Sequence, residues 1–208
     1  MAANQKTTRM VQIALLAGLE ILLAFTPLGY VPIGPVRATT IHIPVIIGGI
    51  LLGPGAGALL GGVFGCTSIL INTLTPTPTS FVFTPFYSVG DASGNLWSLV
   101  IALVPRILIG VAAALVYRLV TRLWHQPFAA SAIAGLCGSM VNTILVMGGI
   151  YLFFGPAYAA ARGIAYSTLI AVIGGVISVN GVLEAIFAAV VTGAVAPALM
   201  RVTKKGLR

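Results

Sequence analysis

Long apolar stretches occupy most of the chain, and short polar or Pro/Gly-containing turns separate them. No charged residue occurs between Arg37 and Asp91, or between Arg122 and Arg162. Because roughly 20 apolar residues cross the hydrocarbon core of a bilayer, the 208 residues allow about six spans. The pattern therefore predicts an all-α integral membrane protein, a six-transmembrane-helix bundle that forms a single membrane domain over residues 1–208.

Gly, Pro and charged residues mark the ends of the predicted helices. The helices are expected at residues 8–27, 39–52, 55–74, 96–124, 127–154 and, for the last one, up to about residue 200. The second is short for a full span. The connection 75–95 is long for so compact a chain, and it carries the only acidic residue in a loop, Asp91. The apolar stretch 163–179 is ambiguous, because it fits either a seventh span or a segment at the membrane face.

The composition agrees with a membrane protein and excludes other classes. Charged residues make up 7% of the chain, against about 25% in an ordinary soluble domain, and hydrophobic residues make up 59%. A disordered chain would be far less apolar, and a disulfide scaffold would need more than two cysteines. The net charge of +8 arises from missing acids as well as from added bases, so it does not favour a nucleic-acid binder.

The positions of the basic residues decide between six and seven spans. With six spans and both termini in the cytoplasm, only Arg37 and Arg162 fall outside, which is a strong positive-inside bias. The basic residues then on the cytoplasmic side are Lys6, Arg9, Arg118, Arg122, Arg201, Lys204, Lys205 and Arg208. A seventh span would place the four basic residues of the C-terminal tail on the external side of the membrane. We therefore expect residues 157–178 to form an external or re-entrant element, and the loops 75–95 and 155–178 to be external and to cover a ligand site.

Small residues recur every four positions, and each series lies on one helix face. The series are Ala14 and Gly18; Gly57, Gly61 and Gly65; Ala130, Ala134 and Gly138; and Ala185, Ala189 and Gly193. Such faces allow two helix backbones to approach closely in lipid. Internal packing is the simpler interpretation for the last three series. The first helix of a bundle is easily peripheral, so Ala14 and Gly18 are predicted to form a docking face for another membrane subunit.

Ionisable residues inside spans are functional candidates because they are costly to bury in lipid. Here they are Glu20, Arg106 and Glu184. Glu184 lies one turn after Asn180, and with Asn142 and Arg106 these groups can converge on a pocket open to the outside, where the guanidinium suits a carboxylate. The alternative is structural, with Arg106 and Glu184 neutralising each other and the asparagines tying helices together. Glu20 is given no role.

Three other side chains near the predicted outer face each allow two interpretations. A lone histidine such as His42 is more often a hydrogen-bonded structural group than a ligand contact. Phe83 and Tyr87 belong to an aromatic cluster of the loop 75–95 that either packs the loop or forms a lid over an organic ligand. Trp97 and Trp124 stand at opposite span ends, as interfacial anchors do.

Motifs for catalysis and for ATP binding are absent. The three lysines are Lys6, Lys204 and Lys205, so the sequence contains no phosphate-binding loop that ends in Gly-Lys-Ser/Thr. It also contains no His-Glu-x-x-His, Cys-x-x-Cys or Gly-x-Ser-x-Gly. The sequence thus offers few recognisable catalytic groups for a membrane enzyme. The larger inverted repeat of secondary transporters is missing as well.

Four stretches taken together resemble the S components of energy-coupling factor (ECF) vitamin transporters, and most of all the pantothenate-specific members. They are Ala38-Thr39-Thr40-Ile41-His42-Ile43-Pro44-Val45-Ile46-Ile47-Gly48, Thr79-Ser80-Phe81-Val82-Phe83-Thr84-Pro85-Phe86-Tyr87, Pro105-Arg106-Ile107-Leu108-Ile109-Gly110 and Asn180-Gly181-Val182-Leu183-Glu184-Ala185. The resemblance covers nearly the whole chain.

The resemblance implies a vitamin-binding subunit, in the cytoplasmic membrane of a prokaryote, that is not an enzyme and has no cofactor. Such a subunit captures its vitamin at the outer face and topples on docking to a T subunit driven by two cytoplasmic ATPases. The family's Ala-x-x-x-Ala docking motif corresponds here to Ala14 and Gly18. The predicted ligand-binding residues are Thr40, His42, Phe83, Tyr87, Arg106, Asn142, Asn180 and Glu184.

Within that set, Arg106, Asn142 and Asn180 are expected to contact pantothenate, and Glu184 either contacts it or orients Arg106. Pantothenate offers a carboxylate, an amide and two hydroxyls to such groups. Three alternatives stay open: another vitamin such as folate or riboflavin, a self-sufficient small transporter or channel, and a small intramembrane enzyme.

Overall fold

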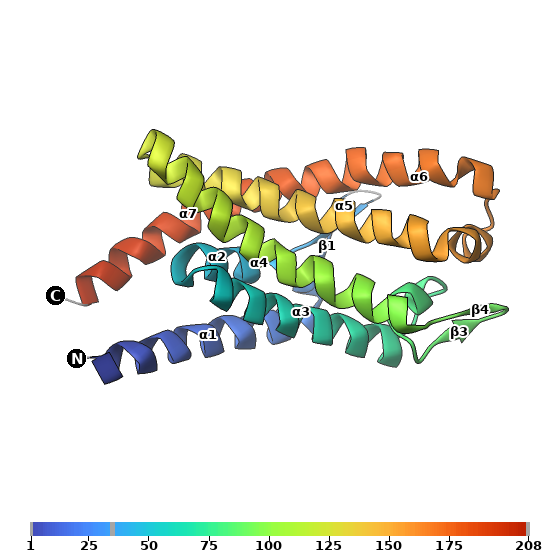
Figure 1. Cartoon of the computed structure of the whole chain (residues 1–208), viewed down its shortest axis with the longest axis horizontal. Helices are drawn as coiled ribbons and strands as arrows, with labels where there is room; N and C mark the ends of the chain where they lie inside the picture. The colour runs from blue at the N-terminus through green and yellow to red at the C-terminus, as the bar shows by residue number, and fades with distance from the viewer. Residues whose placement is uncertain (1, 34–35, 207–208) are drawn as a thin grey trace.

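Six helical rods, five of them long, form an elongated bundle in the computed structural model, which describes residues 2–33 and 36–206 (Figure 1). Five of them are long and apolar enough to cross a membrane. The rods are α1 (Ala2–Ala24), α2 (His42–Leu52), α3 (Pro54–Leu74), α4 (Leu96–Trp124), α5 (Pro127–Ala161) and a last rod made of α6 (Leu169–Val176), a π-helical turn η4 (Ile177–Gly181) and α7 (Val182–Gly206). The predicted six-helix membrane bundle is confirmed, and α2 is short, as expected.

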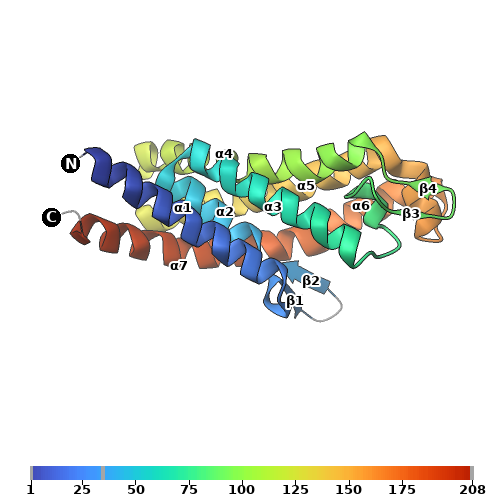
Figure 2. The same cartoon turned by 90° about the horizontal axis from the view of Figure 1, so that it is seen from below.

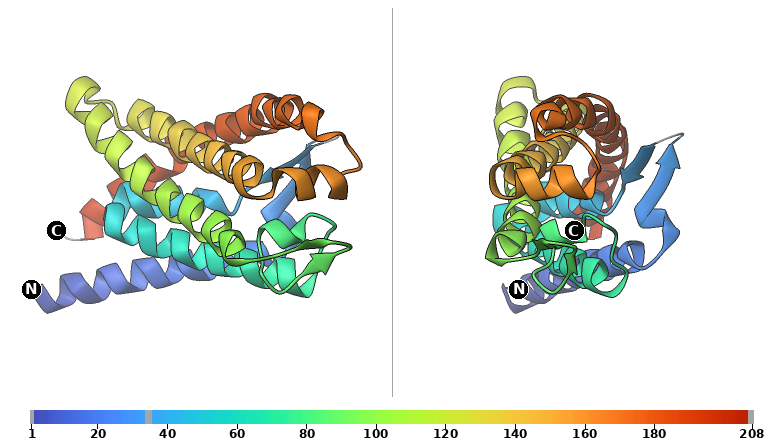
Figure 3. Two further views of the ribbon diagram at one scale, coloured as in Figure 1. Left: turned by 45° about the vertical axis from the view of Figure 1, so that its right-hand side comes forward. Right: turned by 90° about the vertical axis from the view of Figure 1, so that its right-hand side faces the viewer.

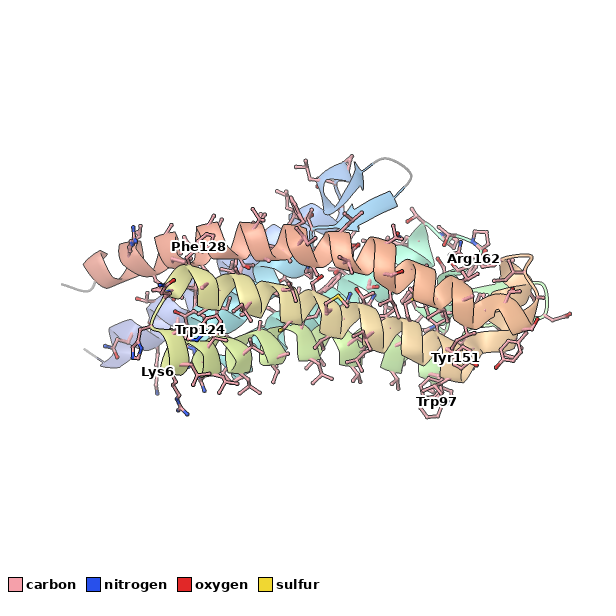
Figure 4. All side chains as sticks on the ribbon, turned by 90° about the horizontal axis from the view of Figure 1, so that it is seen from above. Lys6, Trp97, Trp124, Phe128, Tyr151 and Arg162 are labelled. Carbon is pink, nitrogen blue, oxygen red and sulfur yellow. The ribbon has the colours of Figure 1, made fainter. Side chains whose placement is uncertain are left out.

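Both termini lie at the same end of the bundle, here called the basic end (Figures 1 and 2). The opposite loop end carries the connections after α3 and α5. Trp124 and Lys6 are at the basic end, whereas Trp97 and Arg162 are at the loop end (Figure 4). Which end faces the cytoplasm stays a prediction. The side chains of Arg37, Lys204, Lys205 and Arg208, which the charge argument used, lie outside the described residues.

Local sequence accounts for several element ends. Asn95 caps α4 by accepting from the Trp97 N–H at 2.8 Å, and Ser98 Oγ accepts from the Asn95 N–H at 3.0 Å, so the start of α4 agrees with the prediction. Proline begins both α3 and α5, where its missing N–H is not needed. Gly53 turns α2 into α3 with a φ of 91°, a conformation that suits glycine.

Two segments differ from the prediction. Residues 30–33 (β1) and 36–39 (β2) pair as an antiparallel hairpin, so the second helix begins at His42 rather than at Thr39 (Figures 2 and 3). The separate element expected over 157–178 is wrong in its bounds. The helix α5 continues to Ala161, and from Leu169 onward the chain already belongs to the last rod. A long tilted rod accommodates these residues and still leaves the C-terminus beside the N-terminus.

The loop 75–95 is built as a compact cap. It contains a 3₁₀ turn, η2 (Ser80–Val82), and two short paired strands, β3 (Ser88–Val89) and β4 (Ala92–Ser93). Ser98 Oγ donates to the Phe81 carbonyl at 2.7 Å, and Ser80 Oγ donates to Asn72 Oδ1 at 2.7 Å. These bonds tie the loop to the helices on either side of it.

Glycines of α3 form a seam against α4. A Cβ atom at Gly57 or Gly61 would collide with the backbone of Gly110 or Arg106, and one at Gly65 would lie 2.8 Å from the Ala102 carbonyl oxygen. Ala130 and Ala134 of α5 and Ala185 of α7 are also buried. Internal packing is therefore confirmed for these three small-residue series. Ala14 and Gly18 are exposed instead, and a Cβ at Gly18 would meet no atom within 4 Å.

Candidate functional site

The register of the helices brings several polar residues to one level of the bundle. A Cβ at Gly138 of α5 would lie 3.1 Å from Ile46 Cγ1 of α2 and 3.4 Å from the Ile109 carbonyl oxygen of α4. Because α2 and α4 run antiparallel to α5, one turn toward the loop end from these three positions leads to His42, to Arg106 and to Asn142.

The last rod contributes to the same level. A Cβ at Gly181 would lie 2.8 Å from Cγ2 of Thr143, the neighbour of Asn142, so the adjacent Asn180 is beside the α5 level just described. Asn180 belongs to the π-helical turn, a feature that occurs often at functional sites because it re-aims side chains. Four of the predicted residues, His42, Arg106, Asn142 and Asn180, thus come from four rods to one level, which we call the polar layer.

Arg106 is the buried cation of this layer, with 7% of its surface exposed. Its Nη1 donates to the Ile101 carbonyl at 2.7 Å. That carbonyl is free to accept because Pro105, four residues later in α4, has no N–H to give it. The guanidinium also lies over the rings of Phe64 and Phe83, at 5.5 Å and 5.2 Å from their centroids. A proline and two aromatic rings therefore hold the predicted cation in place.

Glu184 connects the last rod to the hairpin. Its Oε1 accepts a hydrogen bond from the Thr39 N–H at 2.9 Å, and the charge of Arg106 also acts on this carboxylate. Thr40, which follows Thr39 in the chain, is also held in place, because its Oγ1 donates to the Leu28 carbonyl at 2.7 Å. Glu184 and Thr40 thus anchor the end of β2 against the bundle. This contact of Glu184 was not foreseen, because the hairpin itself was not predicted.

Several buried polar atoms near the polar layer lack a hydrogen-bond partner among the described residues. They are both ring nitrogens of His42, Asn142 Oδ1 and Ser139 Oγ. Ser139 lies three residues before Asn142 on the same face of α5 and is 1% exposed. An unpaired buried polar group costs about 1–3 kcal/mol, so such a cluster points to a bound partner. Sequence reasoning missed Ser139, although its spacing from Asn142 offered a clue.

The two aromatic candidates of the loop 75–95 have different surroundings. Phe83 lies over Arg106 and is half-buried. Both Phe83 and Tyr87 also pack against the hydrophobic cluster at the loop end, which includes Phe81 and Phe154, so the contact with Arg106 is what distinguishes Phe83. The loop thus presents Phe83 to the polar layer, whereas Tyr87 packs the cap.

The first helix lies apart from this layer. It packs against α2 and α3 and leaves Ala14 and Gly18 uncovered (Figure 2). Glu20 of this helix is fully buried instead, and its carboxylate has no hydrogen-bond partner among the described residues. The exposed small-residue face is the geometry that a helix-docking surface requires.

Comparison with known proteins identifies relatives along nearly the whole chain. The family model described as "ECF transporter, substrate-specific component" matches residues 8–196. The pantothenic acid transporter PanT of Lactococcus lactis subsp. cremoris is 39% identical over 168 residues, covering 80% of each chain. The pantothenate transporter PanT of Leuconostoc mesenteroides subsp. mesenteroides is 25% identical over 215 residues, covering 98% of this chain and 97% of the relative.

A solved structure shares the fold. It is the crystal structure of the S-component for biotin from an ECF-type ABC transporter, with a TM-score of 0.54, 18% sequence identity and 93% of both chains covered. At this identity the likeness concerns the arrangement of the helices, and the ligand has to be argued from the residues of the polar layer.

Proposed function

The chain belongs to the substrate-specific components of ECF transporters, and we propose that the ligand it binds is pantothenate. The two curated relatives named above carry that substrate in their names. The observation that carries the proposal is the buried guanidinium of Arg106, held beside unpaired polar atoms from α2 and α5. A carboxylate ligand would be the natural counter-ion of such a cation.

The chemistry of the polar layer suits the rest of pantothenate. Arg106 would pair with the carboxylate, and Asn142 and Asn180 would donate to and accept from the amide and the hydroxyls. His42 and Ser139 supply further unpaired atoms, and a ligand hydroxyl can satisfy either of them. Phe83 would cover the ligand from the loop side, while Thr40 and Glu184 would hold the hairpin in place around it. Tyr87 would act indirectly, through the packing of the cap.

The mode of transport follows from the family. The subunit would take up its vitamin on the outer side of the cytoplasmic membrane of a prokaryote, under the loop 75–95 and the connection 162–168 between α5 and the last rod. It would then dock through Ala14 and Gly18 on a T subunit energised by two cytoplasmic ATPases. Both termini would be cytoplasmic, in agreement with the basic end. The chain itself would bind and deliver without catalysis and without a cofactor.

The test is to purify the chain, to identify any co-purifying small molecule by mass spectrometry, and to titrate the ligand-free protein with pantothenate, folate, riboflavin and biotin. We expect tight binding of pantothenate alone. Binding of folate, riboflavin or biotin with none of pantothenate would overturn the substrate assignment while leaving the family intact. Transport in liposomes without partner subunits would contradict the role as a component.

A further inference from the structure

A cavity of about 610 Å³ lies at the basic end, far from the polar layer. It opens between the α4–α5 turn and the C-terminal turns of α7, which diverge at this end in Figures 1 and 3. The residues that line it are Tyr117, Thr121, His125, Gln126, Pro127, Phe128, Gly193, Ala194, Pro197, Ala198, Met200 and Arg201. Neither the proposed vitamin site nor the docking face on α1 uses any of these residues.

The local sequence produces the cavity. The helix α4 ends at Trp124, and His125 turns the chain in the left-handed conformation with a φ of 48°. On the facing helix, Gly193, Ala194 and Ala198 are too small to fill the space. Pro197 lies inside α7 and has no N–H, so the Gly193 carbonyl lacks its usual donor within the helix. A proline among small residues thus leaves a gap beside the α4–α5 turn.

The cavity is amphipathic. Phe128, Pro197 and Met200 give it apolar walls, and the Tyr117 hydroxyl is directed to Met200 Sδ at 3.3 Å. Its rim carries the guanidinium of Arg201, which makes no hydrogen bond or ion pair with another described residue. The helix α5 also begins here, and its N-cap residue Gln126 makes no side-chain capping bond, so first-turn N–H groups are left for another acceptor.

We propose that this cavity binds an anionic phospholipid. The apolar walls would receive part of an acyl chain, and Arg201 would hold the headgroup phosphate at the membrane surface. The depth of the cavity in the membrane suits a lipid headgroup. Trp124 and Phe128 lie at the same end of the bundle and are 64% and 60% exposed, as aromatic residues at a membrane–water interface are (Figure 4). The charge fits as well, because Arg118 and Arg122 of α4 are exposed at this end. A phospholipid matches both the apolar walls and the cationic rim of the cavity.

The test uses the full chain purified in a neutral detergent and titrated with phosphatidylglycerol or phosphatidylcholine, with bound lipid counted by native mass spectrometry. We expect a phosphatidylglycerol adduct of one lipid per chain, and at least about fivefold weaker binding of phosphatidylcholine, the effect of one interfacial cation on an anionic headgroup. Equal retention of the two lipids would overturn the proposal. So would equally tight binding of free glycerol phosphate, because the site would then recognise the anion without the chain.

Two variants and two matched controls locate the site. Arg201→Gln removes the rim cation, and Ala198→Phe fills the cavity without changing charge. Each is expected to weaken the phosphatidylglycerol adduct about fivefold or more. Arg162→Gln and Val195→Phe make comparable changes at exposed positions outside the cavity lining and should leave the adduct intact.

Monodispersity and the unfolding temperature of every variant establish that the fold is retained. Adducts of Ala198→Phe and Arg201→Gln that match those of their controls would place the lipid elsewhere and overturn the proposal.

Discussion

The two sides of α4 show opposite solutions to packing in a membrane bundle. Toward α3, the glycine seam brings the two backbones together so closely that no side chain fits between them, and no buried side-chain N or O atom of α3 lacks a hydrogen-bond partner among the described residues. Among α2, α4, α5 and the last rod, the polar layer holds a buried cation, which also lies over Phe64 of α3, and several buried atoms without partners among the described residues. The glycines of the seam serve close backbone packing, whereas the residues of the polar layer keep hydrogen-bonding atoms available for a ligand. The difference suggests that stability and ligand binding are carried by separate residues, and each prediction below tests that separation.

The largest effect is expected where the seam is broken. Gly110→Leu would drive a side chain into the backbone of Gly57, and overpacking at a backbone contact should cost at least about 3 kcal/mol. We expect poor yield of folded protein, or a fall in unfolding temperature of about 10 °C in a detergent melt. Gly62→Leu is the matched control, because a Cβ at Gly62 meets no atom within 4 Å. Equal stability of the two variants would refute the seam.

The second effect belongs to the polar layer. Arg106→Gln removes the proposed partner of the ligand carboxylate, which should weaken pantothenate binding by about 2–5 kcal/mol, or about 30-fold to several thousandfold. Isothermal titration calorimetry measures this loss, and the melt should show that the protein remains folded. Arg118→Gln, at an exposed position of the same helix, should bind normally. Normal binding by Arg106→Gln would remove this residue from the site.

A smaller and sharper comparison uses two serines of α5. Ser139 lies next to the polar layer, and Ser131 lies toward the basic end; both are buried, and both hydroxyls lack a partner among the described residues. Ser139→Ala should weaken pantothenate binding about fivefold, the effect of one lost hydrogen bond of about 1 kcal/mol. Ser131→Ala should leave binding unchanged. Neither should destabilise the ligand-free protein. If both variants, or neither, lose affinity, the position of the polar layer is wrong.

Much of the fold could be predicted from the sequence, because membrane spans follow from length, hydropathy and charge. The bounds of α4 agree with the prediction, since Asn95 is a good cap and Trp124 precedes a polar turn. The end of α5 does not agree, because the helix continues beyond the predicted residue 154, through Pro156, to Ala161. The hairpin 30–39 was missed because short strands carry little periodicity, and its last residues resemble the start of a helix.

The candidate site was predictable where a residue is unusual in a membrane and unpredictable where its role depends on neighbours. Arg106, Asn142 and Asn180 stand out as polar residues in apolar helices, and the register brings them to one level. Ser139 and the contact of Glu184 with Thr39 do not stand out, because small serines are common in such helices and the contact spans 145 residues of sequence. Only packing reveals such roles.

The smallest effect on binding and stability is expected at the exposed face of α1, which belongs neither to the seam nor to the polar layer. Gly18→Leu adds a side chain where a Cβ meets no atom within 4 Å. The free energy of unfolding should therefore stay within about 0.5 kcal/mol of the wild-type value, and the pantothenate affinity should not change. Vitamin uptake by cells, and co-purification with the T subunit, should nevertheless be lost, because a docking face of small residues tolerates no bulk. Gly62→Leu, an equally open position on α3, should keep both activities. Uptake that survives Gly18→Leu would move the docking face away from α1, whereas loss of vitamin binding would mean that α1 supports the polar layer.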